Sequence, residues 1–143
     1  MDLLERARAL AACPLFAELA PPVVIRLAER AVPRDLAAGE RRSTDDTVWV
    51  VAEGSMAVVA RGAAKLDASV SSMRRHGGTA SAGHVVGLVR VVAPSTPVVE
   101  AIADRPTRVL ALAVDDVRDV LEEDPVALAS LAGALARLLV EGG

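Results

Sequence analysis

The 143-residue chain has the length of one domain, and 52% of its residues are hydrophobic. Its formal net charge of −3 gives no excess of Lys and Arg, which argues against a nucleic-acid-binding domain. Charged residues, Gly or Pro interrupt every apolar run before it reaches the roughly 18 residues that a membrane-spanning helix needs. The first twelve residues are too charged for a secretory signal, and one cysteine, Cys13, cannot form an internal disulfide. We therefore expect a single cytoplasmic domain that has no membrane partner.

The first 32 residues predict helices. One apolar stripe at helical spacing is formed by Leu3, Leu4, Ala7, Leu10 and Ala11. A turn is expected over Cys13–Leu19. Pro21 and Pro22 then suit the first turn of a second helix, where a missing N–H group costs nothing.

Residues 33–113 change to short valine-rich runs separated by Gly, Pro and Asp. The predicted strands are Val48–Ala52, Ser55–Ala60, Ala68–Ser72, His84–Val86, Val89–Val92, Val98–Ile102 and Arg108–Ala113. Arg74–Gly83 is rich in turn residues, so we expect a loop there. Many short strands at this spacing favour a β-sandwich or a β-barrel.

Helical patterns return in residues 114–143. Asp115 and Asp116 suit the cap of one helix, and Asp124-Pro125 begins a second helix that reaches about Val140. The second helix carries a seam with 3-4-3 spacing, formed by Leu128, Leu131, Leu135 and Leu138. Such a seam predicts either contact with a second copy of the chain or packing on the chain's own barrel, and the sequence leaves both open.

This order of elements resembles the cyclic-nucleotide-binding domain family, the ligand-sensing part of catabolite-activator-type regulators. The segments that resemble the family's motifs are Cys13–Leu19, Ile25–Ala31, Ala38–Glu40, Val48–Gly54, Gly83–Leu88, Val99–Asp104 and Asp115–Leu121. The resemblance covers nearly the whole chain and implies an α+β, mainly β fold. We therefore expect a double-stranded β-helix, or jelly-roll barrel, over residues 33–113, between N-terminal helices 1–32 and C-terminal helices 114–143.

The resemblance also implies a degenerate ligand pocket. Ligand-binding members hold the ribose with a Glu and the cyclic phosphate with an Arg, helped by the amides of a short helix. The alignment places Leu88 at the Glu and Ser95 at the Arg, in a segment two or three residues shorter than usual that contains Pro94. We expect little room for the short helix. The residues of this predicted pocket are Gly87, Leu88, Val89, Arg90, Ser95 and Thr96.

Two functions follow from this pattern. The preferred one is a non-catalytic regulatory or assembly module that binds a protein partner or a second copy through the last helix. The alternative is a sensor of a cyclic nucleotide or another small anion, in which Arg90 and Thr96 replace the lost groups. For Arg90, a solvated strand residue is the preferred interpretation. The chain ends without the helix-turn-helix that DNA-binding members carry, so DNA is not an expected partner.

Residues for catalysis or for a metal site are scarce. The sequence contains no nucleophile, phosphate-binding or dinucleotide-binding motif. His76, His84 and Cys13 supply too few ligands for a zinc site, and Cys13 suits a buried core thiol. We therefore expect no enzymatic activity, no metal and no cofactor, with a bound cyclic nucleotide such as cyclic AMP left as the alternative.

Overall fold

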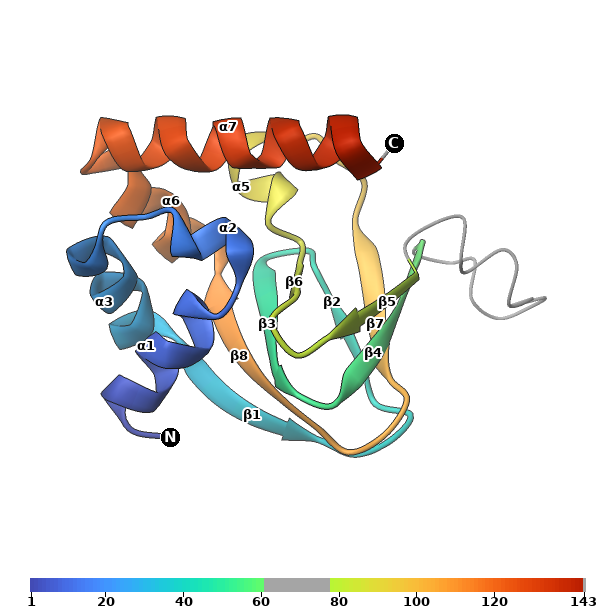
Figure 1. The fold of residues 1–143 in the computed structure, drawn as a ribbon. Helices are drawn as coiled ribbons and strands as arrows, with labels where there is room; N and C mark the ends of the chain where they lie inside the picture. The colour runs from blue at the N-terminus through green and yellow to red at the C-terminus, as the bar shows by residue number, and fades with distance from the viewer. Residues whose placement is uncertain (61–77, 143) are drawn as a thin grey trace.

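The computed structural model describes residues 1–60 and 78–142 of the chain. Figure 1 shows a group of helices beside an antiparallel β-barrel, with the last helix lying along both. The strand predicted at Ala68–Ser72, the basic pair Arg74-Arg75 and His76 lie outside the described residues. In the part that is described, no helix is both long and apolar enough to span a bilayer.

Three helices form the N-terminal part. α1 (Leu3–Ala11) begins with a capping box, in which the Asp2 carboxylate accepts a hydrogen bond from the Glu5 N–H at 2.8 Å. α2 (Pro14–Ala17) stands where a turn was expected. α3 (Pro21–Arg30) begins at the two prolines, as predicted.

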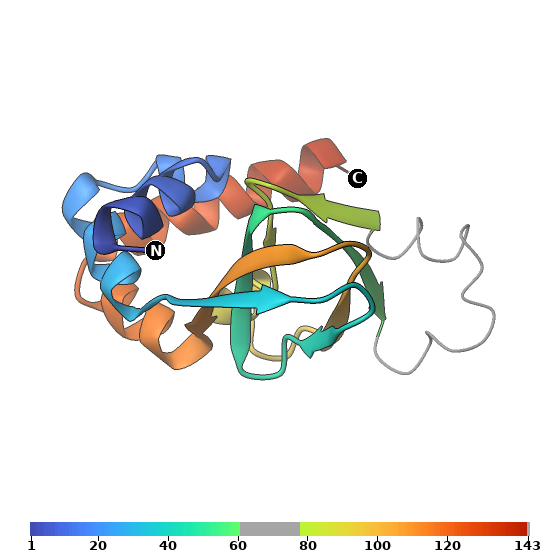
Figure 2. The ribbon, with the colours of Figure 1, turned by 90° about the horizontal axis from the view of Figure 1, so that it is seen from below.

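The barrel consists of two four-stranded sheets, and every pairing is antiparallel (Figure 2). One sheet has the order β1 (Val32–Leu36), β8 (Thr107–Ala113), β3 (Thr47–Glu53) and β6 (Val85–Val86). The other has the order β2 (Arg41–Ser43), β7 (Val99–Ala103), β4 (Ser55–Ala60) and β5 (Gly78–Ser81). This arrangement confirms the predicted mainly β, jelly-roll type of fold, and β3, β4, β6, β7 and β8 lie where strands were predicted.

Two segments differ from their predictions. Val89–Val92 was predicted as a strand but forms the short helix α5. Leu88 and Val91, three residues apart, are both buried, and a helical turn brings them to one side, whereas a strand would point them to opposite faces. Gly78–Ser81, expected in a loop, pairs with β4 from Ser55 to Val58 as β5.

The C-terminal helices are α6 (Val114–Glu122) and α7 (Pro125–Gly142). Asp115 and Asp116 do not cap α6, because the helix begins one residue earlier, and they lie in its first turn. Asp124 caps α7, since its carboxylate accepts hydrogen bonds from the N–H groups of Val126 and Ala127 at 3.1 and 3.2 Å.

The leucine seam of α7 packs on the chain itself. Leu131 and Leu135 are 0% and 4% exposed in the core between the helices and the barrel, and the half-buried Leu128 packs against the same core. The side chain of Leu138 lies outside the description. The outward face of α7 instead carries Val126, which is 75% exposed, and the exposed residues Ala129, Ala132 and Ala136.

Candidate ligand pocket

The segment Gly83–Thr96 builds one side of the barrel and contains β6 and α5. Between these two elements the backbone turns at Gly87, where φ is +92°. A side chain there would be strained, and its Cβ would lie 2.9 Å from Cγ2 of Thr44. Glycine therefore allows the segment to approach Thr44 closely and to place α5 against the helices.

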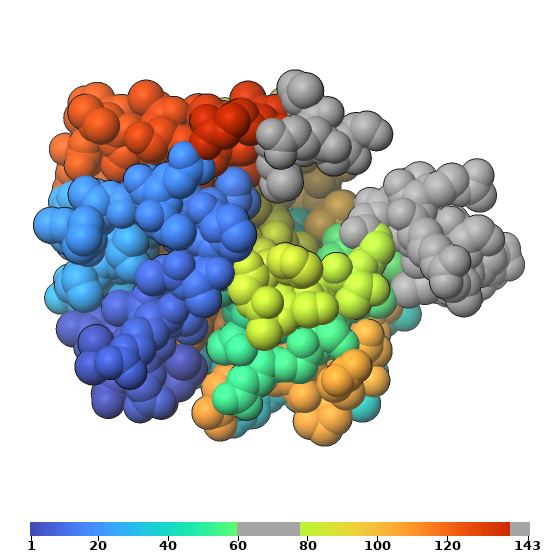
Figure 3. All heavy atoms as spheres, in the orientation of Figure 1, coloured from blue at the N-terminus to red at the C-terminus, as the bar shows by residue number. Residues whose placement is uncertain are grey.

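A cavity of about 440 Å³ opens beside this segment. Its barrel side is lined by Val58 of β4, Ala80 of β5, Val86 of β6 and Val99 of β7. The chain from Cys13 to Leu15 and the β5–β6 turn, including His84, complete the lining. Figure 3 shows the face on which the blue α1–α2 region borders the yellow-green β5–β6 region. None of the described residues that line this cavity is Asp, Glu, Lys or Arg.

Leu88 does not line this cavity. It is 2% exposed and belongs to the core that joins α1, α3, α6 and α7 to the outer side of β3 and β8. Val89 packs against the same core, and Ser95 is exposed. Of the predicted pocket residues, only Gly87 borders the cavity.

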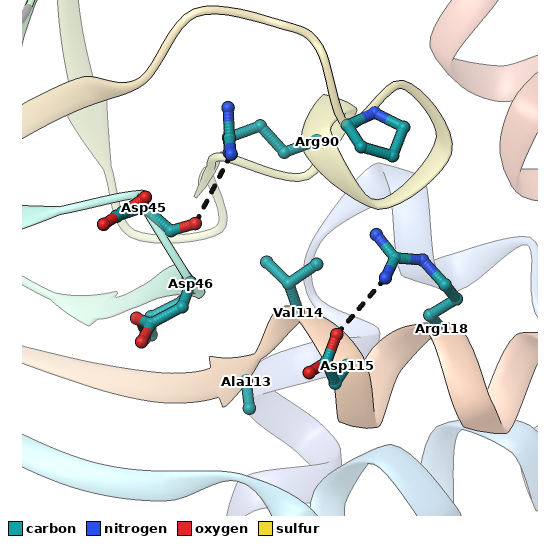
Figure 4. A pocket seen from close by; sticks show the side chains of 9 residues that line it. Asp45, Asp46, Arg90, Ala113, Val114, Asp115 and Arg118 are labelled. Atoms are coloured by element: carbon teal, nitrogen blue, oxygen red, sulfur yellow. Dashed lines mark hydrogen bonds and ion pairs between the residues drawn. The ribbon is translucent and has the colours of Figure 1, made fainter.

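Arg90 lies in a different cleft, of about 320 Å³, between α5, the β2–β3 turn and the start of α6 (Figure 4). Its guanidinium donates Nη1 to the Thr96 carbonyl and Nη2 to the Asp45 carbonyl, the latter at 3.4 Å. Arg90 is therefore a partly buried helix residue that ties two loops together, not the solvated strand residue that we expected. The Thr96 hydroxyl donates to the Ala93 carbonyl at 2.7 Å, so it also serves the local turn.

The charges in this second cleft do not favour an anion. Asp45, Asp46 and Asp115 line it together with Arg90 and Arg118. Arg118 is itself paired with Asp115 at 3.2 Å, as Figure 4 shows. Three carboxylates against two guanidinium groups give the cleft a net negative charge, which would repel a phosphate.

Other reactive groups in the described part of the chain show no catalytic arrangement. Burial raises the pKa of the Cys13 thiol to about 11, so the group stays protonated and unreactive at neutral pH. The Cys13 Sγ donates to the Ala9 carbonyl at 3.5 Å. Over the residues that the structure describes, no three His, Cys, Asp or Glu side chains gather as a metal site would require.

No protein-family model matches the chain, and no curated protein matches it. Solved structures do. A candidate cyclic-nucleotide-binding protein of Geobacter metallireducens matches 94% of this chain over 96% of its own, with 16% identity and a TM-score of 0.72. A candidate cyclic-nucleotide-binding protein of Ruegeria pomeroyi matches 99% of this chain, with 19% identity and a TM-score of 0.70. The regulatory subunit of a cAMP-independent protein kinase A from Trypanosoma brucei matches 94%, with 16% identity and a TM-score of 0.67. The chain spans 63% of the Ruegeria chain and 47% of the Trypanosoma chain.

This is the cyclic-nucleotide-binding fold. The resemblance read from the sequence is confirmed at the level of the fold. α5 occupies the place of the short helix for which we expected little room. The short helix is therefore kept although the segment from Leu88 to Ser95 is shorter than usual.

Sequence reasoning missed two contributors to this region. Thr44, in the β2–β3 connection, is fully buried against Gly87, and Arg118 donates from Nε to the Val91 carbonyl at 3.5 Å. Thr44 lies in none of the segments that resemble the family's motifs, and Arg118 lies within Asp115–Leu121 but was given no role there. The signal for Thr44 was the small number of residues between Glu40 and Val48, which requires that connection to lie close to the barrel.

Proposed function

We propose that the chain is a non-catalytic regulatory or assembly module that acts through protein–protein contacts and does not hold a cyclic nucleotide in its barrel. One observation carries this proposal: among the predicted pocket residues of segment 87–96, no charged side chain faces the cavity. Leu88 is buried in the helical core, Ser95 is exposed, and Arg90 is bound to backbone carbonyls in another cleft.

The energetic consequence is large. A cyclic phosphate that enters the cavity would lose its hydration without gaining a guanidinium partner. Truncating one partner of a buried, hydrogen-bonded charge pair costs about 2–5 kcal/mol, which corresponds to roughly one and a half to three and a half orders of magnitude in affinity. Arg90 does not line the cavity, and Nη1 and Nη2 of its guanidinium bind two backbone carbonyls in the other cleft.

The outward face of α7 is the surface that best supports a protein contact. A helix that is apolar on all sides is normally buried. From Pro125 to Arg137 the only charged residue is Arg137, and it pairs with Glu18 of the same chain at 2.6 Å. Val126 and the exposed alanines thus form an apolar strip, and its small side chains allow a second α7 to approach closely. The occupant that we propose is a second copy of this chain.

One structural neighbour supports a regulatory role without cyclic AMP. The Trypanosoma protein with this fold is named as the regulatory subunit of a cAMP-independent kinase. A barrel of this type can therefore belong to a regulatory protein whose activity is described as independent of cyclic AMP. For the present chain we infer from this neighbour only that a regulatory role without cyclic AMP is compatible with the fold.

The alternative function, a cyclic-nucleotide or small-anion sensor, is favoured by two observations. α5 is present, and the cavity is large enough for a small ligand. A thermal-shift titration with cyclic AMP and cyclic GMP separates the two functions. At 1 mM ligand, a Kd of about 10 µM would stabilise the fold by about 2.7 kcal/mol. That stabilisation corresponds to a rise in Tm of roughly 5–10 °C. We expect no rise; a rise that Arg90→Ala abolishes would establish the sensor instead.

Sedimentation tests the contact surface. We expect a dimer for the unmodified chain and a folded monomer for Ala132→Glu, which places a charge in the middle of the outward face of α7. Ala38→Glu, on the exposed β1–β2 turn, is the matched control and should remain a dimer. An unmodified chain that sediments as a monomer at micromolar concentration would contradict the proposed self-contact.

A further inference from the structure

We infer that the barrel cavity binds an uncharged, mainly apolar small molecule, an inference that rests on the proposed loss of cyclic-nucleotide binding. The cavity measures about 440 Å³, within the range of roughly 300–1,000 Å³ that small-molecule sites occupy. It lies between Val58, Ala80, Val86 and Val99, contributed by four different strands. These strands come from both sheets of the barrel, so the barrel holds this side of the site, and the segment Cys13–Leu15 and the β5–β6 turn close it.

Over the residues that the structure describes, the lining contains no Asp, Glu, Lys or Arg. Apart from His84, its side chains are apolar, hydroxyl or thiol groups. Cys13 does not supply an anion, because burial raises its pKa to about 11. A charged ligand would therefore lose its water without a compensating partner, whereas an apolar ligand gains by leaving water.

Among the described lining residues, the hydroxyl group and the imidazole ring lie at the rim of the cavity. Thr79 and His84 are exposed residues of β5 and of the β5–β6 turn. Nδ1 of His84 already accepts a hydrogen bond from the Ser81 N–H at 2.8 Å, so Nε2 carries the ring proton in the neutral form and is free to meet a ligand. The ligand that fits has an apolar body against the valines and a single neutral polar group toward this rim.

A matched pair of fluorescent probes tests the assignment. N-phenylnaphthylamine is uncharged, and anilinonaphthalene sulfonate has the same aromatic body with an added sulfonate. We expect N-phenylnaphthylamine to bind the intact chain saturably with one site per chain, and the sulfonate to bind about tenfold or more weaker. Equal binding of the two probes would overturn the inference that the site selects against charge.

Two variants locate the site. Val58→Phe fills the cavity from β4, and Ala80→Leu fills it from β5 with a smaller group. Each should raise the Kd of N-phenylnaphthylamine by about tenfold or more, provided that a thermal melt shows the variant to be folded. Ala38→Phe, on the exposed β1–β2 turn, adds a similar group outside both the cavity and the outward face of α7 and should leave the Kd unchanged. Unchanged binding in folded Val58→Phe and Ala80→Leu would place the probe outside the barrel and overturn the inference.

Adding cyclic AMP to the same titration distinguishes failure of this inference from failure of the proposed function. Displacement of N-phenylnaphthylamine by cyclic AMP would overturn both, because the cavity would then accept a phosphate. Absence of binding by either compound would overturn the inference alone and leave the proposed function standing. Binding of the neutral probe without displacement supports both.

Discussion

At the scale of single residues, Thr44 links the β2–β3 connection to Val99 of β7 and packs against Gly87. Its side chain is fully buried, its Oγ1 accepts a hydrogen bond from the Val99 N–H at 2.9 Å, and its hydroxyl donates to the Val99 carbonyl at 3.1 Å. Thr44→Val keeps the shape of the side chain but leaves the Val99 N–H without its partner. We expect the free energy of unfolding, measured by urea denaturation, to fall by about 1–3 kcal/mol.

The control for this prediction is Thr79→Val, the same change at an exposed residue of β5 on the rim of the cavity. Surface substitutions of this kind usually stay within about 0.5 kcal/mol. If Thr44→Val were as stable as Thr79→Val, the two hydrogen bonds would contribute nothing net, and Thr44 would act only by filling space.

Glu40 makes stability depend on pH. Its carboxylate accepts a hydrogen bond from the Ala37 N–H at 2.8 Å and another from Arg42 at 3.0 Å, and these contacts hold its pKa below the ordinary value of 4.5. The folded chain therefore binds this proton less readily than the unfolded chain. The stabilisation is complete above about pH 4.5 and is lost as the pH falls through the lowered pKa. Glu40→Gln should remove this part of the acid dependence of Tm; an unchanged acid limb would contradict the assignment.

The pocket residues show how far single positions can be interpreted from sequence. The absence of an acid at position 88 and of an Arg at position 95 is visible in the alignment of motifs. The directions in which the Leu88 and Arg90 side chains point cannot be predicted from the sequence. They depend on the helices packed against α5 and on a carbonyl that is distant in the chain. Asp45, whose carbonyl Arg90 contacts, is 45 residues away.

At the scale of elements, α6 and α7 differ in how they begin. Asp124 accepts two backbone hydrogen bonds at the start of α7, whereas Asp115 acts on α6 only as a charge in its first turn and as a partner of Arg118. Asp124→Ala should lower the free energy of unfolding by about 0.5–2 kcal/mol, measured by urea denaturation. Asp115→Ala, the matched control, should lower it by about 0.3–1 kcal/mol. A larger loss for Asp115→Ala would show that the ion pair matters more than the cap.

The failed prediction for α5 also belongs to this scale. Val89–Val92 contains three β-branched residues, a composition that favours a strand when no other information is used. The structure makes it helical because Leu88 and Val91 must both reach the helical core. Tertiary burial therefore outweighs local propensity in this short segment. Longer elements such as β3 and β8, where the pattern extends over seven residues, were predictable.

At the scale of the whole molecule, β3 and β8 lie between two cores. Val48 and Val50 of β3 face the helices, whereas Trp49 and Val51 face the barrel interior. Both sides of β3 are thus buried, which is why its sequence is an unbroken apolar run rather than an alternating one. The composition of residues 48–51 could therefore indicate a central strand. It could not indicate that the second core consists of the N-terminal helices together with α6 and α7.

The position of α7 lets folding and assembly be separated by mutation. Leu131 is fully buried between α7 and the rest of the helical core, so Leu131→Ala should lower the free energy of unfolding by about 2–5 kcal/mol. Val126→Ala removes a 75% exposed side chain and should change it by no more than about 0.5 kcal/mol. Urea denaturation measures both.

Under conditions in which it remains folded, Leu131→Ala should keep the oligomeric state of the unmodified chain, because its side chain does not reach the outward face of α7. Ala132→Glu, one residue further along the helix, should show the opposite pattern, with a retained Tm and a lost dimer. Leu131 is buried and Ala132 is exposed, so the two adjacent positions point to different sides of α7. Each variant is therefore the control for the other. If Leu131→Ala instead dissociated a dimer without loss of stability, the leucine seam would be the interface, and α7 would have to leave its present position on the core to form it.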